Sequence, residues 1–378
     1  MFPTVERLMF TGADVYAAPD PMPEGDHGLL IQAQRVVPTP PGLGGVYRVL
    51  YRSTSVQGAP IAVSGVVYLP PGRPPKLGWP LISWARGTSG SADICAPSKS
   101  IGADDVPLTL ARQGFVTAAT DYEGLGTPGV HPYLVGASEG RSTLDIVRAA
   151  DQLPDLHVRR EFSVWGHSQG GHAALFAREL AREWIPERTL VGTVAIAPPT
   201  FIPQAVLAWT TRVRAKGLGL MALAGIASAY PEANLDELMA PGLAAQLRMT
   251  LEAGCTAEVN RAFADIDGGS ILRADPTVIE PWASLLSRQE PVSRPGEGPA
   301  LVVQGSTDGT LPPEMSDAVK QQMCARGEQI TRWLLADVGH GEVISAAWND
   351  MRQWTRDRFA GVEASSNCGL ADDSPSGP

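Results

Sequence analysis

The stretch EFSVWGHSQGGH at residues 161–172 decides which fold we expect for this chain. Its apolar start indicates a buried strand, the glycines around Ser168 indicate a tight turn, and residues with helical spacing continue to Trp184. A strand, a turn and a helix in this order make a nucleophile elbow, which holds a serine hydroxyl above the end of its strand. With 40 glycines in 378 residues, the Gly-x-Ser-x-Gly spacing is weak by itself, so its context carries the prediction. We predict that Ser168 is a nucleophile; a glycine-rich turn without chemistry is the alternative.

Short apolar runs on both sides of this stretch predict a mostly parallel central sheet. Such runs are typical of strands buried on both faces, and they lie at residues 80–86, 115–121, 161–166, 190–197 and 300–304. Helical patterns at 137–153 and 170–184 separate several of them, and alternating runs at 46–54 and 60–69 predict an antiparallel strand pair. Strand and helix alternation of this kind indicates an α/β fold with helices flanking the sheet.

The regions outside these runs divide the chain into predicted parts. Residues 1–45 are rich in proline and glycine and predict an extended N-terminal arm. Residues 201–290 have helical periodicity without a convincing strand and predict a helical cap inserted between two late core strands. The core is then 46–200 together with 291–362, and 363–378 is a C-terminal tail that we expect to be disordered from Gly369 onward.

A serine nucleophile needs a base and an acid, and the chain offers one good candidate for each. His340 lies between two glycines after the strand-like run 330–335, and Asp308 follows the buried run 300–304. The order Ser168, Asp308, His340 is that of the α/β-hydrolase fold. Asp337 is the competing acid, but in the same loop as His340 it approaches the imidazole badly.

The oxyanion that forms during acyl transfer needs N–H donors. The backbone N–H of Gln169 opens the helix after the nucleophile, where helix N-termini bind anions. The loop Arg86-Gly87-Thr88-Ser89-Gly90 follows a predicted central strand, and it can supply a second N–H from Thr88 or from Ser89. A turn with no such role is the alternative for this loop.

Composition excludes several classes of function. The net charge is −10 and there is no basic run, which argues against nucleic-acid binding. The longest apolar stretch, 217–230, is shorter than the roughly 20 residues of a bilayer span, so no integral membrane segment is expected. The pattern Gly-x-Gly-x-x-Gly at 124–129 is interrupted by Pro128, which prevents the helix of a dinucleotide site. We expect no cofactor.

The cysteines and the N-terminus bear on location. Cys95, Cys255, Cys324 and Cys368 are too far apart in sequence for a zinc or redox pair, so we expect no metal, and they fit two disulfides or four buried thiols equally well. Disulfides favour an exported protein and thiols the cytoplasm. The N-terminal residues lack a signal-peptide pattern, so we expect either synthesis without a leader or a chain that begins at the mature enzyme.

The motifs together resemble the secretory lipase family, the α/β-hydrolases similar to Candida antarctica lipase A. The resemblance runs from Tyr16 to Cys368 and rests on GHSQGG at 166–171 and on the segments 95–98, 121–124 and 140–145, with the closing residues Cys324, Gly339, His340 and Cys368. It implies ester hydrolysis, export, a helical cap, and disulfides Cys95–Cys255 and Cys324–Cys368. The implied triad falls on the three residues chosen above. Arg86 departs from the pattern, since bacterial relatives often have histidine there.

The predicted function is that of a serine carboxylic-ester hydrolase, which acts on short- to medium-chain acyl esters or acylglycerols through an acyl-enzyme on Ser168. A serine peptidase or an acyltransferase with the same triad is the alternative. The cap is either an acyl-binding wall or a shield for the core edge, so lipase and esterase both stay open. The expected partner is a lipid or small-molecule ester, with transient contact at a lipid interface. The expected location is secreted or extracytoplasmic, with the cytoplasm second.

Overall fold

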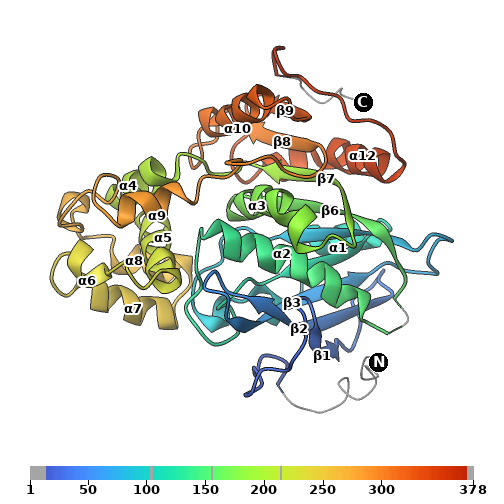
Figure 1. The fold of residues 1–378 in the computed structure, drawn as a ribbon, viewed down its shortest axis with the longest axis horizontal. Coiled ribbons are helices and arrows are strands. Elements are labelled where there is room, and N and C mark those ends of the chain that lie inside the picture. Colours follow the sequence, from blue (N-terminus) through green and yellow to red (C-terminus); the bar gives the residue numbers. More distant parts are fainter. Residues whose placement is uncertain (1–13, 103–104, 155, 213–214, 373–378) are drawn as a thin grey trace.

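The computed structural model describes residues 14–102, 105–154, 156–212 and 215–372. Its centre is one sheet in the strand order β1-β2-β3-β5-β4-β6-β7-β8-β9 (Figure 1). The strands are β1 (Leu30–Arg35), β2 (Gly45–Thr54), β3 (Pro60–Leu69), β4 (Trp79–Ala85), β5 (Val116–Thr120), β6 (Val158–His167), β7 (Thr189–Ile196), β8 (Ala300–Gly305) and β9 (Ile330–Leu335). Pairs from β1 to β5 are antiparallel and those from β5 to β9 are parallel. The predicted mostly parallel sheet is confirmed.

Helices cover both faces of the sheet. The core helices are α1 (Asp105–Arg112), α2 (Gly136–Asp151), α3 (Gln169–Trp184), α10 (Pro313–Ala325), α11 (Val343–Ala346) and α12 (Trp348–Phe359). In β6, Phe162 and Val164 pack with α2 and α3 on one face, whereas Trp165 packs with α1 and α12 on the other. Because side chains of a strand alternate between faces, one apolar run supplies both layers of the core.

The segment between β7 and β8 is helical and forms a lobe beside the sheet (Figure 1). It contains α4 (Ile202–Thr211), α5 (Lys216–Ala229), α6 (Leu235–Leu238), α7 (Leu243–Ala253), α8 (Thr256–Ala262) and α9 (Trp282–Ser287). We call it the α4–α9 insertion. Its apolar cluster includes Leu220, Leu247 and Phe263, and also Tyr133 and Leu311 from the core. The insertion is therefore packed onto the core near the ends of the strands.

Two expectations for the chain ends need correction. Residues 30–35, expected in an extended arm, form β1 and pair with β2, since Leu30 and Ala33 are apolar enough to join the core cluster beneath the sheet. Residues 369–372, expected to be disordered, are held because the Asp372 carboxylate binds Lys320 and Arg332. Residues 1–13 and 373–378 lie outside the described residues.

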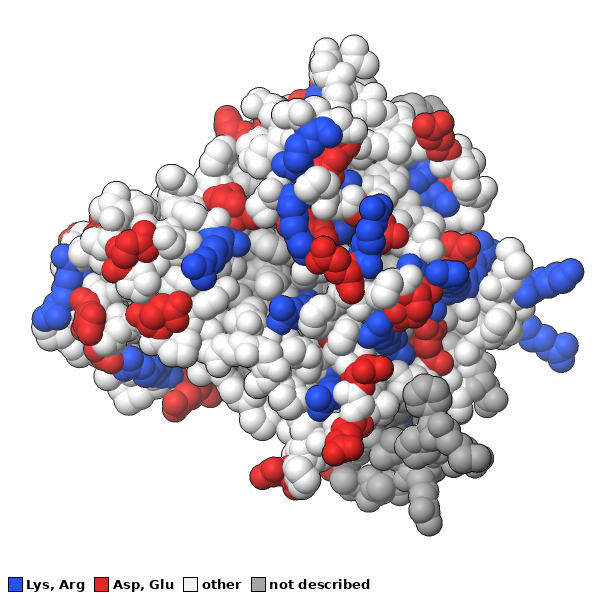
Figure 2. All heavy atoms as spheres, viewed as in Figure 1, with Lys and Arg blue, Asp and Glu red and all other residues white. Residues whose placement is uncertain are grey.

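Charged side chains of both signs are interspersed over the face drawn in Figure 2. Among the described residues, no helix is long and apolar enough to cross a membrane.

Candidate active site

Ser168 lies at the sharp turn between β6 and α3, with φ 57° and ψ −121°. A positive φ is strained for a residue with a side chain, and it is typical of an elbow that projects the serine from the sheet. Two glycines make the turn possible: a Cβ on Gly166 would lie 1.9 Å from the Gly170 carbonyl oxygen, and one on Gly170 would lie 1.9 Å from the Ala85 carbonyl oxygen. The strand-turn-helix predicted from the sequence is present, and Ser168 is half-buried at its apex.

Asp308 and His340 come together from loops after neighbouring strands. Asp308 follows β8 and His340 follows β9, and the carboxyl ends of parallel strands share one edge of the sheet. His340 Nδ1 lies 2.7 Å from Asp308 Oδ2. The backbone N–H groups of Thr310 and Leu311, each at 2.9 Å, donate to the other carboxylate oxygen of Asp308. These backbone hydrogen bonds hold the Asp308 carboxylate in place independently of His340, so it can orient the imidazole.

Hydrogen bonding keeps Asp308 ionised. Burial raises its pKa, but the hydrogen bonds from His340, Leu311 and Thr310 outweigh burial, and the pKa lies below the usual range. Asp337, the competing acid in the sequence, is exposed, and its backbone N–H donates to Ser306 Oγ at 2.9 Å. Of the two candidate acids, the structure joins Asp308 to the imidazole.

The His340 loop is tied to the elbow through the residue before the nucleophile. His167 Nε2 donates to the carbonyl oxygen of His340 at 3.0 Å, and the two rings lie 4.7 Å apart at their centres. Within the described residues, Ser168 Oγ makes no hydrogen bond to His340. Such bonds are often long in a free enzyme and tighten when substrate binds. Serine, imidazole and acid therefore share one edge of the sheet, with the serine–imidazole bond still to form.

The candidate oxyanion donors lie on two sides of the elbow. Gln169 is the first residue of α3, so its backbone N–H has no acceptor within the helix. Thr88 follows β4, and its Oγ1 lies 3.0 Å from the Tyr133 hydroxyl. The Ser89 carbonyl accepts the N–H of Thr256 at 3.3 Å, which holds this loop against the α4–α9 insertion. Gln169 and the Thr88 loop are both near the elbow, because β4 is the neighbour of β6.

A model of the secretory lipase family matches residues 98–367. The chain belongs to the secretory lipase family. It is similar to Lipase A of Moesziomyces aphidis, with 23% identity over 83% of this chain and 72% of that protein. It is also similar to a probable inactive lipase of Mycobacterium tuberculosis, with 26% identity over 83% of this chain and 73% of the other. The predicted family is confirmed.

A solved structure of Candida antarctica lipase A in its closed state superposes with a TM-score of 0.83 at 20% identity, over 99% of this chain and 91% of the other. At that identity the likeness shows the fold, which is the α/β-hydrolase fold predicted from the sequence.

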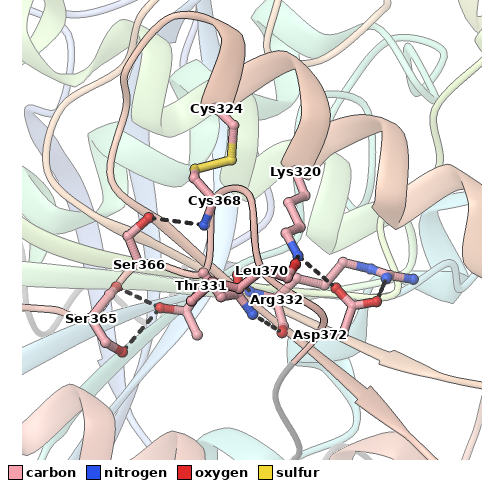
Figure 3. Close-up of a disulfide and its surroundings, with 10 residues drawn as sticks. Lys320, Cys324, Thr331, Arg332, Ser365, Ser366, Cys368, Leu370 and Asp372 are labelled. Carbon is pink, nitrogen blue, oxygen red and sulfur yellow. Dashed lines mark hydrogen bonds and ion pairs between the residues drawn. A yellow bond between two sulfur atoms is a disulfide. The ribbon is translucent and has the colours of Figure 1, made fainter.

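Both disulfides implied by the family are present. Cys95 bonds Cys255 at the N-terminus of α8, and Cys324 of α10 bonds Cys368 near the C-terminal end. The first joins the segment after the Thr88 loop to the α4–α9 insertion, directly beside the candidate site. The second fastens the final segment to α10, as Figure 3 shows.

A cavity of about 520 Å³ lies against the candidate oxyanion loop, residues 86–90. Its lining includes Thr88, Ser89, His167, Ile94, Ile344 and the Cys95–Cys255 disulfide. The lining also includes Arg86, Ser100 and Asp105, so the wall is mixed in polarity, and neither Ser168 nor His340 is part of it. In the part of the chain that the structure describes, no three His, Cys, Asp or Glu side chains are grouped to hold a metal.

Sequence reasoning missed a set of buried polar residues around Gln169. They are fully or almost fully buried and come from four separate segments: His131, Glu139, His172 and Gln289. Glu139 lies in the first turn of α2, where acidic residues are common on exposed helix ends, so its burial carries no signal in the sequence.

Proposed function

We propose that this protein is a serine carboxylic-ester hydrolase that works through an acyl-enzyme on Ser168. The single observation that carries the proposal is the 2.7 Å contact between His340 Nδ1 and a buried Asp308, at the sheet edge where the elbow presents Ser168. An ionised acid accepts a hydrogen bond from Nδ1–H, so the Nε2 lone pair is free to take a proton. That is the base a serine hydroxyl requires.

The reaction begins when Ser168 Oγ attacks the ester carbonyl and His340 Nε2 takes its proton. The N–H of Gln169 and that of Thr88, or of Ser89, bind the oxyanion, and each such donor contributes about 3 kcal/mol to transition-state stabilisation. His340 then protonates the departing alcohol. Water, activated by the same imidazole, releases the acid and restores Ser168.

The family includes lipases and a relative described as probably inactive, so membership alone does not establish activity. Ser168, Asp308 and His340 are all present in this chain, which supports an active enzyme. A short- to medium-chain ester or an acylglycerol is our proposed substrate class because the chain is similar to a lipase, and the ester series below tests the chain length. We also propose that residues 201–290 act as a cap, because the α4–α9 insertion packs on Tyr133 next to the oxyanion loop.

We propose an extracytoplasmic location for the protein. The family is described as secretory, and both disulfides are of a kind that persists in oxidising compartments.

The test is hydrolysis of p-nitrophenyl esters from acetate to palmitate, with Ser168→Ala as the blank. We expect activity to peak at short or medium chains and the variant to lose at least about 1,000-fold in kcat, because triad members act as a unit. A fluorophosphonate probe should label Ser168 in the wild type. Amide cleavage or alcohol-dependent product partitioning would indicate a peptidase or an acyltransferase instead. Absence of both labelling and Ser168-dependent hydrolysis would refute catalysis by this triad.

A further inference from the structure

Around the Gln169 side chain lies a polar network that the proposed reaction does not use. Glu139 and His172 are fully buried, and His131, Gln169 and Gln289 expose 2% or less. Unpaired polar atoms at such depth are costly, so each donor there needs an acceptor. The hydrogen-bond partners can therefore be assigned from geometry.

Both amide hydrogens of Gln169 have a defined acceptor. His131 Nδ1 lies 2.9 Å from the Glu123 carbonyl oxygen, which only accepts, so Nδ1 carries the hydrogen. Burial lowers the pKa of His131, which favours the neutral ring with a lone pair on Nε2. Gln169 Nε2 donates to that nitrogen at 2.9 Å and to Glu139 Oε1 at 2.8 Å. The side-chain amide is thus held from two sides.

Glu139 also holds the helix one turn further on. Its Oε2 lies 2.9 Å from His172 Nδ1, and His172 Nε2 donates to the Gln289 carbonyl oxygen at 2.7 Å. The N–H of Leu134 donates to Oε1 at 2.9 Å. One carboxylate therefore binds the side chains of residues 169 and 172, which lie on the turn of α3 that directly follows the strained Ser168.

We propose that Glu139 is a positioning residue that aims the backbone N–H of Gln169 at the oxyanion. The inference rests on the proposed function, since it gives that N–H the role of oxyanion donor. The N–H has no acceptor within the helix, so its direction depends on how the first turn of α3 is held. A preorganised donor must lie about 3 Å from the developing charge, and small displacements weaken it.

The test compares substitutions of two buried carboxylates on the same helix. Glu139→Met removes both carboxylate oxygens and keeps a side chain of similar length. Asp145→Leu is the matched control, because Asp145 is buried on α2 and bonds His27, Ser53 and Trp184 away from the elbow. We expect Glu139→Met to lower kcat for p-nitrophenyl butyrate by about 10- to 100-fold with little change in KM, because misaiming a donor costs less than losing it. Asp145→Leu should stay within about threefold of wild type, as expected of a site away from the reacting atoms.

Glu139→Gln is the conservative variant. Its amide oxygen can accept from Leu134 and Gln169, and its amide nitrogen can donate to His172 Nδ1, because His172 Nε2 already donates to the Gln289 carbonyl oxygen. We expect this variant to recover most of the activity that Glu139→Met loses. If the carboxylate charge mattered rather than the positioning, Glu139→Gln would be as impaired as Glu139→Met, and the proposal would be wrong.

A thionoester separates positioning from a general loss of structure. Sulfur accepts hydrogen bonds more weakly than oxygen, so oxyanion donors contribute less to cleavage of the thionoester. We expect Glu139→Met to lose activity on the oxygen ester and much less on the thionoester. Equal losses on both esters would show a merely structural role. If Glu139→Met does not fold, Gln169→Met removes the same link and keeps the backbone N–H, and the same difference between esters is expected.

Failure of the proposed function would be seen in the wild type, as absence of Ser168-dependent hydrolysis of either ester. The positioning claim then has its own readout, the backbone amide resonance of Gln169 in a ¹H–¹⁵N spectrum. A displaced resonance in Glu139→Met with an unchanged one in Asp145→Leu supports the claim. An unmoved resonance in Glu139→Met overturns it.

Discussion

The two disulfides fasten regions of the molecule with different duties. Cys95–Cys255 spans 160 residues and joins the segment after the oxyanion loop to the α4–α9 insertion. Cys324–Cys368 spans 44 residues and joins α10 to the C-terminal segment, beside the pairing of Lys320 with Asp372 (Figure 3). On the chain-entropy model these loops contribute about 5 and about 4 kcal/mol, which is nearly the same stabilisation. The difference lies in what each bond holds in place: the candidate oxyanion loop in one case and the segment around Cys368 in the other.

The largest expected effect is on kcat, and it comes from a substitution in the candidate site, the region that Cys95–Cys255 borders. Asp308→Asn should lower kcat about 10³- to 10⁴-fold, because asparagine no longer selects the tautomer of His340 that offers a lone pair at Nε2. Asp337→Asn, in the same loop as the imidazole, is the matched control and should stay near wild type. Steady-state kinetics on one ester checks both variants. A large loss in Asp337→Asn and none in Asp308→Asn would mean that the acid has been assigned wrongly.

The site disulfide comes next. Cys95→Ser combined with Cys255→Ser should reduce the free energy of unfolding by about 2–5 kcal/mol and also lower kcat about 10-fold or more. The second effect follows because Ser89 and Thr88 lose their support from the insertion. Denaturant unfolding and ester kinetics well below the new midpoint measure the two effects separately. Full activity in the folded double variant would show that Cys95–Cys255, like Cys324–Cys368, contributes to stability alone.

Removing the remote disulfide should affect stability alone. Cys324→Ser combined with Cys368→Ser should also reduce the free energy of unfolding by about 2–5 kcal/mol. We expect kcat to stay within about twofold of wild type, since neither cysteine touches the elbow or the oxyanion loop. The same unfolding and kinetic assays apply. A parallel fall in kcat at temperatures where the variant is folded would contradict this expectation.

The smallest effect concerns α3, the helix that begins at the elbow. Burial raises the pKa of Glu179 to about 7, although the Arg294 charge lowers it. The native state therefore holds a proton that the unfolded chain releases between about pH 4.5 and 7, and stability falls as pH rises through that window. Glu179→Gln should raise the free energy of unfolding by about 1–3 kcal/mol at pH 8 and change it little at pH 4. A pH-independent effect in denaturant melts would contradict the assignment.

The core strands and the candidate triad could be predicted from the sequence because their signals are local. Each buried strand is one apolar run, and Ser168, Asp308 and His340 each follow such a run directly. Asp308 could be ranked above Asp337 because it follows a buried strand, whereas Asp337 lies in the same loop as His340. β1 was missed because its six residues include the polar Gln32, Gln34 and Arg35 and lie in a proline-rich segment.

Other parts of the site depend on contacts between distant residues. Cysteine spacing left disulfides and thiols equally open, and only the family resemblance supplied the pairing. The Glu139 network joins residues from 123 to 289, and nothing near Glu139 in sequence indicates burial. Such partners are brought together by the folded sheet and the insertion, so local patterns do not reveal them.

The two residues of the Cys95–Cys255 bond are synthesised at different times. A chain emerges from synthesis N-terminus first. Ser168 and the oxyanion loop are therefore present long before Cys255 is available to fasten that loop, and Asp308 and His340 follow later still. A growing chain therefore contains Ser168 before its proposed base, and the candidate oxyanion loop before the cysteine that fastens it. Under the proposed function, hydrolysis therefore requires residues far along the chain, because both Cys255 and His340 must have been synthesised.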